Sequence, residues 1–406
     1  RLRRPVGPLQ ARPMTGRRHD IAIAGGGLSG GLIALALQRA RPELDVVLLE
    51  AGGAPGGNHR WSWFASDLDE AGADLLSAMR ITRWDQGYDV AFPAHARRLT
   101  TGYRSLASAD FAAALARELA PGTIRANAQV VALHADGVEL ETGARIAART
   151  VIDCRGFAPS PDLCGGWQVF MGRHLRTAQP HGVTRPVIMD ARVNQHGAYR
   201  FVYVLPLAHD ELFIEDTYYA DSPDLDRRAL SSRIDAYCAN HGWNGELLGH
   251  ETGVLPVVTG GNFNAWQASL RVPGVARAGA RAGFVHPLTS YTLPQAAATA
   301  QLIAREADLP GEQLAALLEG EAARHWSATG FYRRLGAMLF GAGAPDQRYR
   351  IFERFYRLPE PSIERFYAAR STLGDKARVL VGKPPVPVLG AMRALLASGA
   401  PMAERA

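Results

Sequence analysis

Residues 20–30 read DIAIAGGGLSG, and the unit that they begin extends to Glu50. The apolar run 21–24 is short and predicts a buried strand. The glycine-rich residues 25–30 predict a turn, and residues 31–39 predict a helix. A second buried strand is expected over residues 46–49, directly before Glu50. Strand, turn, helix and strand in this order indicate an α/β fold built on a largely parallel sheet.

The spacing of Gly25, Gly27 and Gly30 matches the G-x-G-x-x-G pattern of dinucleotide-binding proteins. In that pattern the first glycine permits the tight turn, and the second lets the backbone approach a pyrophosphate. The third allows the helix to pack closely on the strand. The helix N-terminus then offers N–H groups to the phosphates, and Glu50, 20 residues after Gly30, can accept a hydrogen bond from a ribose hydroxyl. A glycine-rich turn in a doubly wound sheet without a ligand is the alternative.

FAD is expected rather than NAD, because this unit opens the folded chain, as in flavoproteins that wrap an extended cofactor. A second glycine-bearing segment, residues 279–284, follows an expected strand at 275–278 and precedes a helix that begins at Gln295. FAD enzymes of the hydroxylase type place a second phosphate and flavin contact there, although many have an acid at the position of Arg281. The residues expected to bind the cofactor are Gly25, Gly27, Leu28, Ser29, Gly30, Glu50, Val130, Gly279 and Gly283.

Composition and charge exclude several classes of protein. With 47% hydrophobic and 21% charged residues in 406, the chain is neither disordered nor fibrous, and it has no apolar run of membrane-spanning length. The net charge of +6 equals the six arginines of residues 1–18, which we expect to be a disordered basic tail. The remainder is neutral, so we expect no nucleic-acid partner. Three cysteines without metal-ligand spacing predict no metal site and a reducing, cytoplasmic location.

The remaining pattern predicts an antiparallel sheet inserted into the α/β body, with strands at 167–171, 187–193, 199–205 and 211–219. The expected fold class is therefore α/β: a Rossmann-type FAD-binding domain of the hydroxylase-like (GR2) kind, an inserted β-sheet substrate domain, and a helical C-terminal region. The FAD-binding domain is expected over 19–60, 96–165 and 270–310. The substrate domain is expected over 61–95 and 166–269, and the helical region over 311–406.

Several stretches resemble the bacterial flavin-dependent lycopene β-cyclases, in the family's order from about residue 19 to 390. The more restricted ones are GGNH at 56–59 with WSW at 61–63, and IEDT at 214–217 within 201–221. The others are VIDCRG at 151–156, RAGFVHP at 281–287 through YTLP at 291–294, RFYRLP at 354–359 through ERFY at 364–367, and GKPP at 382–385.

The resemblance implies cyclisation of the linear ψ-ends of lycopene to β-ionone rings, giving β-carotene by way of γ-carotene. Such enzymes need FAD in its reduced state, supplied by NAD(P)H, although the reaction involves no net redox change. Proton transfer to the C1=C2 alkene requires a well-placed acid in a dry site, because water would capture the cation. We expect the reduced flavin to stabilise the carbocation electrostatically, the alternative being that reduction only sets a conformation.

The resemblance points to Glu215 as the acid–base residue, with Asp216 in support. Adjacent residues on a strand point to opposite faces, so only one of the two can face the substrate directly. Burial on either face would raise the pKa of the carboxyl and keep its proton on near neutral pH. The alternative is an exposed acidic pair near a hairpin.

Aromatic faces stabilise cations, and ordinary core packing is the alternative for each candidate. Those expected to line a polyene tunnel are Trp61, Trp63, Trp167, Phe170, Tyr203 and Tyr291.

Because lycopene resides in the bilayer, peripheral membrane association is expected. Residues 376–406 combine five basic residues and one acid with apolar residues, which suits an interfacial anchor, the alternative being a packed helix.

Two other functions stay open. One is another FAD enzyme acting on a polyprenoid, such as a monooxygenase or a reductase, which should lack the acidic pair. The other is a carotenoid-binding protein with structural FAD, whose effect should not depend on Glu215. The sequence leaves open the oligomeric state and the choice between NADH and NADPH.

Overall fold

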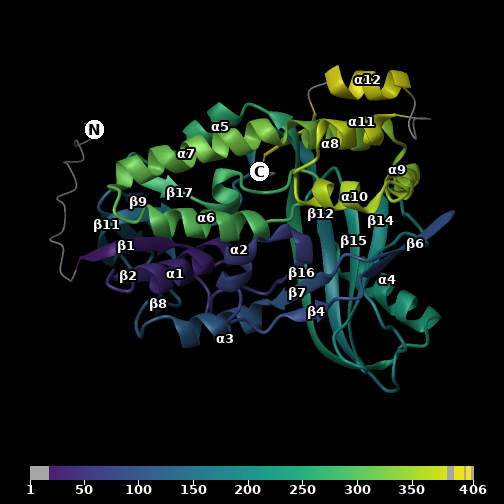
Figure 1. The fold of residues 1–406 in the computed structure, drawn as a ribbon, viewed down its shortest axis with the longest axis horizontal. Coiled ribbons are helices and arrows are strands. Elements are labelled where there is room, and N and C mark those ends of the chain that lie inside the picture. Colours follow the sequence, from purple (N-terminus) through teal and green to yellow (C-terminus); the bar gives the residue numbers. More distant parts are fainter. Residues whose placement is uncertain (1–17, 382–387, 397–398, 404–406) are drawn as a thin grey trace, which may run out of the picture.

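The computed structural model describes residues 18–381, 388–396 and 399–403, and Figure 1 shows its two large sheets side by side with helices packed around them. The α/β fold with a second, antiparallel sheet and C-terminal helices is the expected one. Apart from Arg18, the basic tail expected over residues 1–18 lies outside the described residues, as does the proline-rich stretch 382–387. Within the described ranges, no helix is both long enough and apolar enough to span a bilayer.

The first sheet contains the strand and helix unit expected from residues 20–50. Ile21 and Ile23 of β1 face one core, while Ala22 and Ala24 face another on the opposite side. β1 runs parallel to both of its neighbours, β2 and β11. The strand order is β8 (Ile124–Arg125), β2 (Val46–Leu49), β1 (His19–Ala24), β11 (Arg145–Asp153), β10 (Gly137–Leu140) and β9 (Val130–His134), with β17 (Val275–Arg277) also on β11.

Helix α1 (Leu28–Ala40) is buried along most of its length, because it lies between this sheet and other helices. It packs on α6 (Leu293–Arg305), while α7 (Gly311–Ala328) lies against β17 (Figure 1). Small and aliphatic residues occupy nearly all of α1, which lets the sheet and the neighbouring helices pack closely against it. The first turn of α1 and the start of α6 thereby come to the same end of the sheet.

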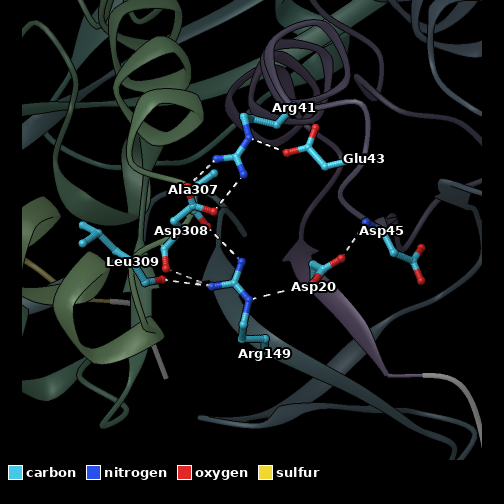
Figure 2. Close-up of polar contacts among 8 residues, drawn as sticks. All are labelled: Asp20, Arg41, Glu43, Asp45, Arg149, Ala307, Asp308 and Leu309. Atoms are coloured by element: carbon cyan, nitrogen blue, oxygen red, sulfur yellow. Dashed lines mark hydrogen bonds and ion pairs between the residues drawn. The ribbon is translucent and has the colours of Figure 1, made fainter.

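Polar contacts tie these elements together at the opposite end of the sheet (Figure 2). Both Nη atoms of Arg41, just after α1, bond the carboxylate of Asp308, just after α6, at 2.8 and 2.9 Å. Arg149 of β11 donates to the carbonyls of residues 307–309, the nearest at 2.9 Å. These contacts link the end of α1 and the end of α6 to β11.

The second sheet is built around the long central strand β12 (Ser160–Thr177), with β15 (Glu211–Ala220) on one side and β16 (Gly245–Gly261) on the other. Its other strands in order beyond β15 are β14 (Tyr199–Pro206), β13 (Val187–Asp190), β5 (Tyr88–Phe92) and β6 (His95–Leu99). β18 (Pro401–Met402) also pairs with β12. Helix α4 (Arg227–Asn240) lies against one face (Figure 1).

Strands at 199–205 and 211–219 were expected and are present, but β16 was not expected. Its sequence carries five glycines, one proline and few consecutive apolar residues, so neither an alternating nor a continuous hydrophobic pattern appears. The strand forms because β12 supplies a pairing partner along its whole length, from Leu163 opposite Gly261 to Thr177 opposite Gly245. The expected strand 167–171 is likewise only the centre of β12.

A small sheet and a group of helices complete the fold. β3 (Arg60–Phe64) pairs with β7 (Tyr103–Ala107), which also pairs with β4 (Thr82–Trp84). The C-terminal region is helical, as expected, and lies over the upper part of the second sheet (Figure 1). Its helices are α8 (Gly330–Ala342), α9 (Tyr349–Phe355), α10 (Glu360–Tyr367), α11 (Leu373–Leu380) and α12 (Val388–Leu396).

Candidate active site

A cavity of about 510 Å³ lies where the glycine turn after β1 meets the second sheet. Gly27 and Leu28 line one end of it, and Glu215 lines another part of the wall. Most of the remaining wall is apolar or aromatic, including residues 253–256 of β16 and residues 289–293 before α6. The expected cofactor turn and the expected acid–base residue therefore border one continuous space.

The glycine turn has the geometry that a dinucleotide requires. Gly25 has a φ of +103°, and a Cβ there would lie 2.7 Å from the carbonyl oxygen of Cys154. A Cβ on Gly30 would lie 2.0 Å from the carbonyl oxygen of Gly25, so only glycine lets α1 begin so close to β1. A Cβ on Gly27 would meet no atom within 4 Å. The face of the turn at Gly27 is open, as an approaching phosphate would need.

The other residues expected to bind the cofactor lie around this turn. Glu50 ends β2, and its carboxylate accepts hydrogen bonds from the N–H groups of Gly26 at 2.9 Å and Gly52 at 2.6 Å. Ser29 is half-buried in the first turn of α1. Val130 begins β9, and its carbonyl accepts a long hydrogen bond of 3.4 Å from Arg155.

The second glycine segment meets the first, as expected for one cofactor held by both. Gly279 has a φ of +61°, and a Cβ there would lie 2.7 Å from the Cβ of Ser29. Gly283 has a φ of +86° and ends the short helical turn Gly279–Ala282. Arg281, where many related enzymes have an acid, donates to the carboxylate of Asp153 at 3.1 Å.

Asp153 ends β11 beside this segment, and two arginines hold it. Burial raises its pKa, but hydrogen bonds from Arg155 and the charge of Arg281 outweigh burial, so the pKa lies below its usual value. Asp153 is therefore a carboxylate that fixes the two loops relative to each other. Many related enzymes have an acid at the position of Arg281; here the positive charge of Arg281 is balanced by the carboxylate of Asp153.

Glu215 lies at the centre of the second sheet, opposite Tyr203 of β14 and Gly172 of β12. Its Oε1 accepts a hydrogen bond of 2.7 Å from the hydroxyl of Thr217. Burial raises the pKa of Glu215 to about 7, against the hydrogen bond from Thr217 and the charge of Arg60, which lower it. A carboxyl with this pKa keeps its proton in a large fraction of molecules near neutral pH, which a general acid requires.

Asp216 points to the opposite face and does not line the cavity. It is fully buried and accepts hydrogen bonds from Nε of Arg200, 2.9 Å from both carboxylate oxygens, and from Nη2 of the same residue. Arg200 is itself buried, so the two charges form a closed pair in the core. The alternation of the strand directs its carboxylate away from the cavity, and the supporting role expected for Asp216 stays a prediction.

Five of the six aromatic residues expected to line a polyene tunnel line this cavity, namely Trp61, Trp167, Phe170, Tyr203 and Tyr291. Trp63 does not: it is 3% exposed and packs into the core that contains α1. The expectation for Trp63 is therefore corrected. Trp61 and Trp63 share one face of β3, and both pack against that core, but only Trp61 also reaches the cavity.

Tyr103, Arg60 and Phe213 of the wall, and Glu251 beside it, were not among the residues expected in the site. The hydroxyl of Tyr103 lies 3.1 Å from that of Tyr291, and the guanidinium of Arg60 lies 5.3 Å from the centre of the Phe213 ring. Glu251 of β16 is 6% exposed, and its pKa is raised to about 8 by burial and by the nearby Glu215. Phe213 lies within the stretch 201–221 that carried the resemblance and Arg60 lies between the stretches 56–59 and 61–63, whereas Tyr103 and Glu251 lie outside all of these stretches.

The two histidines in those stretches differ in their surroundings. His59 lines the cavity, and burial lowers its pKa. His286 is buried, lies 3.0 Å from the carbonyl oxygen of Phe366, and has its pKa lowered by burial to about 3. His286 is therefore neutral and structural. Among the residues that the structure describes, no three metal-binding side chains gather to hold an ion.

Solved structures share this fold at low sequence identity. The tryptophan 5-halogenase MibH aligns with a TM-score of 0.56 at 15% identity, over 96% of this chain and 92% of its own. A geranylgeranyl bacteriochlorophyll reductase-like protein of Thermoplasma acidophilum aligns with a TM-score of 0.54 at 13% identity, over 94% and 96%. These likenesses show the fold.

Sequence relatives are much nearer. Lycopene beta-cyclase of Pseudescherichia vulneris is 45% identical over 93% of this chain and 97% of its own length. That of Paracoccus sp. is 43% identical over 93% and 97%, and that of Pantoea ananas 41% over 93% and 98%. The family model described as "Lycopene cyclase protein" matches residues 20–393, and the chain therefore belongs to the lycopene cyclase family.

Proposed function

We propose that this protein is a lycopene β-cyclase that closes the ψ-ends of lycopene to β-ionone rings by acid–base catalysis at Glu215. The observation that carries the proposal is the place of Glu215: a carboxyl with a raised pKa in the wall of an aromatic cavity that reaches the glycine turn. The lycopene beta-cyclases to which the chain is similar give the substrate and the reaction.

The proton balance of the reaction fits one carboxyl group. Glu215 gives its proton to C2 of the terminal C1=C2 alkene, which leaves a tertiary cation at C1 and a carboxylate at Glu215. The C5=C6 alkene forms the C1–C6 bond, and the cation moves to C5. Glu215 then accepts the proton from C6, so the ring closes and the acid is restored without net redox change. Repetition at the second end converts γ-carotene to β-carotene.

The cavity wall protects and stabilises the cation. Trp61, Trp167 and Phe170 present aromatic rings, each of which can stabilise a nearby cation by roughly 0.5–2 kcal/mol. Some polar groups in and beside the wall are engaged, since the Thr217 hydroxyl donates to Glu215 and the Tyr103 and Tyr291 hydroxyls pair with each other. Gln168 Oε1 and Thr289 Oγ1 of the wall have no hydrogen-bond partner within the described residues, but most of the wall is apolar or aromatic, which limits the water that could capture the cation.

FAD fits the residues beside this cavity. The open face at Gly27, the N-terminus of α1, the adjoining Gly279 and the carboxylate of Glu50 suit a pyrophosphate and a ribose. In its reduced form, maintained by NAD(P)H, the flavin supplies negative charge that favours a carbocation in a medium of low dielectric constant. Gly27 and Leu28 line the same cavity as Glu215, so a cofactor held by this turn adjoins the reacting polyene.

The polyene is proposed to enter from a membrane surface that the protein contacts with α11 and α12. Exposed large apolar residues concentrate there, with Leu373 84% and Leu396 86% exposed, beside the basic residues Lys376 and Arg393. Below them lies an apolar cavity of about 270 Å³ bounded by α8 to α12, and Thr289 lines both this cavity and the first one. An apolar and basic face of this kind suits a bilayer with anionic lipids.

Expression in a lycopene-accumulating host tests the proposal. We expect the carotenoid to change from red lycopene to orange-yellow β-carotene, and the Glu215→Gln variant to leave lycopene unchanged. Consumption of NADPH or oxygen in proportion to product would indicate a reductase or monooxygenase instead. A carotenoid-binding protein with structural FAD would act equally well as the Glu215→Gln variant.

A further inference from the structure

Glu215 has a second carboxyl beside it on the same face of the sheet. Gly172 of β12 pairs with Glu215 of β15 on one side and with Glu251 of β16 on the other. Residues directly opposite each other on adjacent strands carry their side chains on the same face, so the two glutamates flank Gly172 in one row. Gly172 has no side chain to separate them, and the ring of Phe213 covers it, 2.2 Å from where a Cβ would lie.

Both carboxyls interact with the positive charge of a single guanidinium, that of Arg60. Arg60, on β3 across the cavity wall, has its guanidinium over the Phe213 ring at 5.3 Å, and Nη1 donates to the Ser105 hydroxyl at 3.2 Å. The charges of Glu251 and Glu215 both act on Arg60, that of Glu251 more strongly. Two buried carboxylates beside one guanidinium would leave an uncompensated negative charge, which burial disfavours.

We propose that Glu215 and Glu251 share one proton beside Arg60, and that Glu251 is a positioning residue that keeps this proton available to Glu215. The proposal rests on the proposed function, because it assigns the proton that reaches the substrate. Glu251 does not line the cavity, whereas Glu215 does, so only Glu215 delivers the proton. The resting site is then neutral: one guanidinium, one carboxylate and one carboxylic acid.

The net charge of the site with its substrate stays zero throughout the reaction, and only its distribution changes while the substrate is cationic. Transfer of the proton to C2 leaves two carboxylates, one guanidinium and one carbocation, which are again neutral together. Return of the C6 proton to Glu215 restores the pair. The second carboxylate therefore stabilises the positive charge of the polyene. After the ring closes, the returned proton is again shared by Glu215 and Glu251.

The surroundings of the pair contain few other groups that titrate near neutral pH. Burial raises the pKa of both carboxyls, and the negative charge of Glu215 raises that of Glu251 further. The polar and titratable groups near the pair are Thr217 on β15, Tyr203 on β14, Tyr103 on β7, Arg60 on β3 and His59 before it. The charge of Asp110, on helix α3 (Ser108–Glu118), acts on Arg60, and that of Asp216 on the opposite face acts on Glu215. The pKa of each of these tyrosines is raised by burial, so neither ionises near neutral pH.

The decisive experiment is the pH profile of cyclisation by the full-length protein with FAD bound. Glu251→Gln leaves Glu215 alone beside Arg60, so its proton is lost at lower pH. We expect the pH at which activity falls on the alkaline side of the profile, its high-pH limb, to decrease by about one unit. At pH values above this limb the variant should then be about tenfold less active than the wild type. Arg60→Gln should move the limb upward, and Glu251→Asp should restore a profile close to that of the wild type. Glu246→Gln, on the exposed part of the same strand, is the matched control and should change nothing.

A second readout does not depend on activity. In infrared spectra of the folded protein, the band of protonated carboxyl groups should titrate at lower pH in Glu251→Gln and in Glu215→Gln than in the wild type. A limb that stays in place in Glu251→Gln, or activity lost equally at all pH values, overturns the proposal. If the wild type does not cyclise lycopene, the proposed function fails, while the infrared titration still decides whether the carboxyls share a proton.

Discussion

The replacement Glu215→Gln separates the catalytic role of a buried carboxyl from its effect on stability. Glutamine keeps the shape of the side chain and can still accept the hydrogen bond from Thr217. It has no proton that it can give to an alkene. General acid catalysis contributes on the order of 10²–10⁴-fold to a rate, so we expect at least a 100-fold loss of cyclisation.

The same replacement should stabilise the fold at alkaline pH. The pKa of Glu215 is about 7 in the folded protein, raised by burial from an ordinary value of 4.5. Below pH 4.5 both the folded and unfolded states hold the proton, and between pH 4.5 and about 7 only the folded state does, so stability is lost as pH rises to about 7. About 1.4 kcal/mol for each of about 2.5 pH units gives a loss of about 3–4 kcal/mol. The uncharged glutamine avoids this loss.

Two measurements test this reasoning. Carotenoid extraction from lycopene-accumulating cells reports cyclisation, and denaturant unfolding at pH 5 and pH 8 reports stability. Glu211→Gln is the matched control, because Glu211 lies on the same strand but outside the cavity and is paired with Arg176. A Glu215→Gln variant that still makes β-carotene, or that is less stable than the wild type at pH 8, would refute the argument.

Three further replacements test other parts of the structure. Asp216→Asn leaves the buried Arg200 without its partner, so the free energy of unfolding should fall by about 3–5 kcal/mol while folded protein keeps its activity. Gly27→Ala should weaken FAD binding, measured by flavin fluorescence, with little change in unfolding, whereas Gly30→Ala should destabilise the fold because its Cβ meets the backbone at 2.0 Å. Serine substitutions on the exposed face of α12 should reduce sedimentation with anionic vesicles and leave unfolding unchanged; they are Leu389→Ser, Met392→Ser and Leu396→Ser. The first argument is contradicted if Asp216→Asn is as stable as the wild type, and the second if Gly27→Ala binds flavin with unaltered affinity. The third is contradicted if the serine variants of α12 still bind vesicles as the wild type does.

Local patterns in the sequence were sufficient for the strand, turn and helix at residues 20–50. Gly30 is required by the carbonyl of Gly25, only five residues before it, whereas the close contact at Gly25 is with Cys154 from a distant part of the chain. The alternation along residues 211–219 likewise showed that Glu215 and Asp216 must face opposite sides. It could not show which side holds the cavity, because that depends on where β3, the loops before α6 and the neighbouring strands pack.

The pairing of distant strands brought together what no local pattern could connect. β16 lacks a hydrophobic pattern of its own and exists as a strand because β12 pairs with it, so Glu251 had no recognisable place in the sequence. Trp63 was misassigned for a related reason, since the path of β3 into the core is set by packing.

The sequence by itself determined the dinucleotide turn, the class of fold and the resemblance to the lycopene cyclases, because these depend on residue types at short, regular spacings. Only the tertiary structure decided that Glu215 faces the cavity, that Asp216 belongs to a closed ion pair with Arg200, and that Glu251 and Arg60 lie beside the acid. Burial and the electrostatic environment of a carboxyl arise from every chain segment around it, and the segments that line this cavity come from residues 27 to 293.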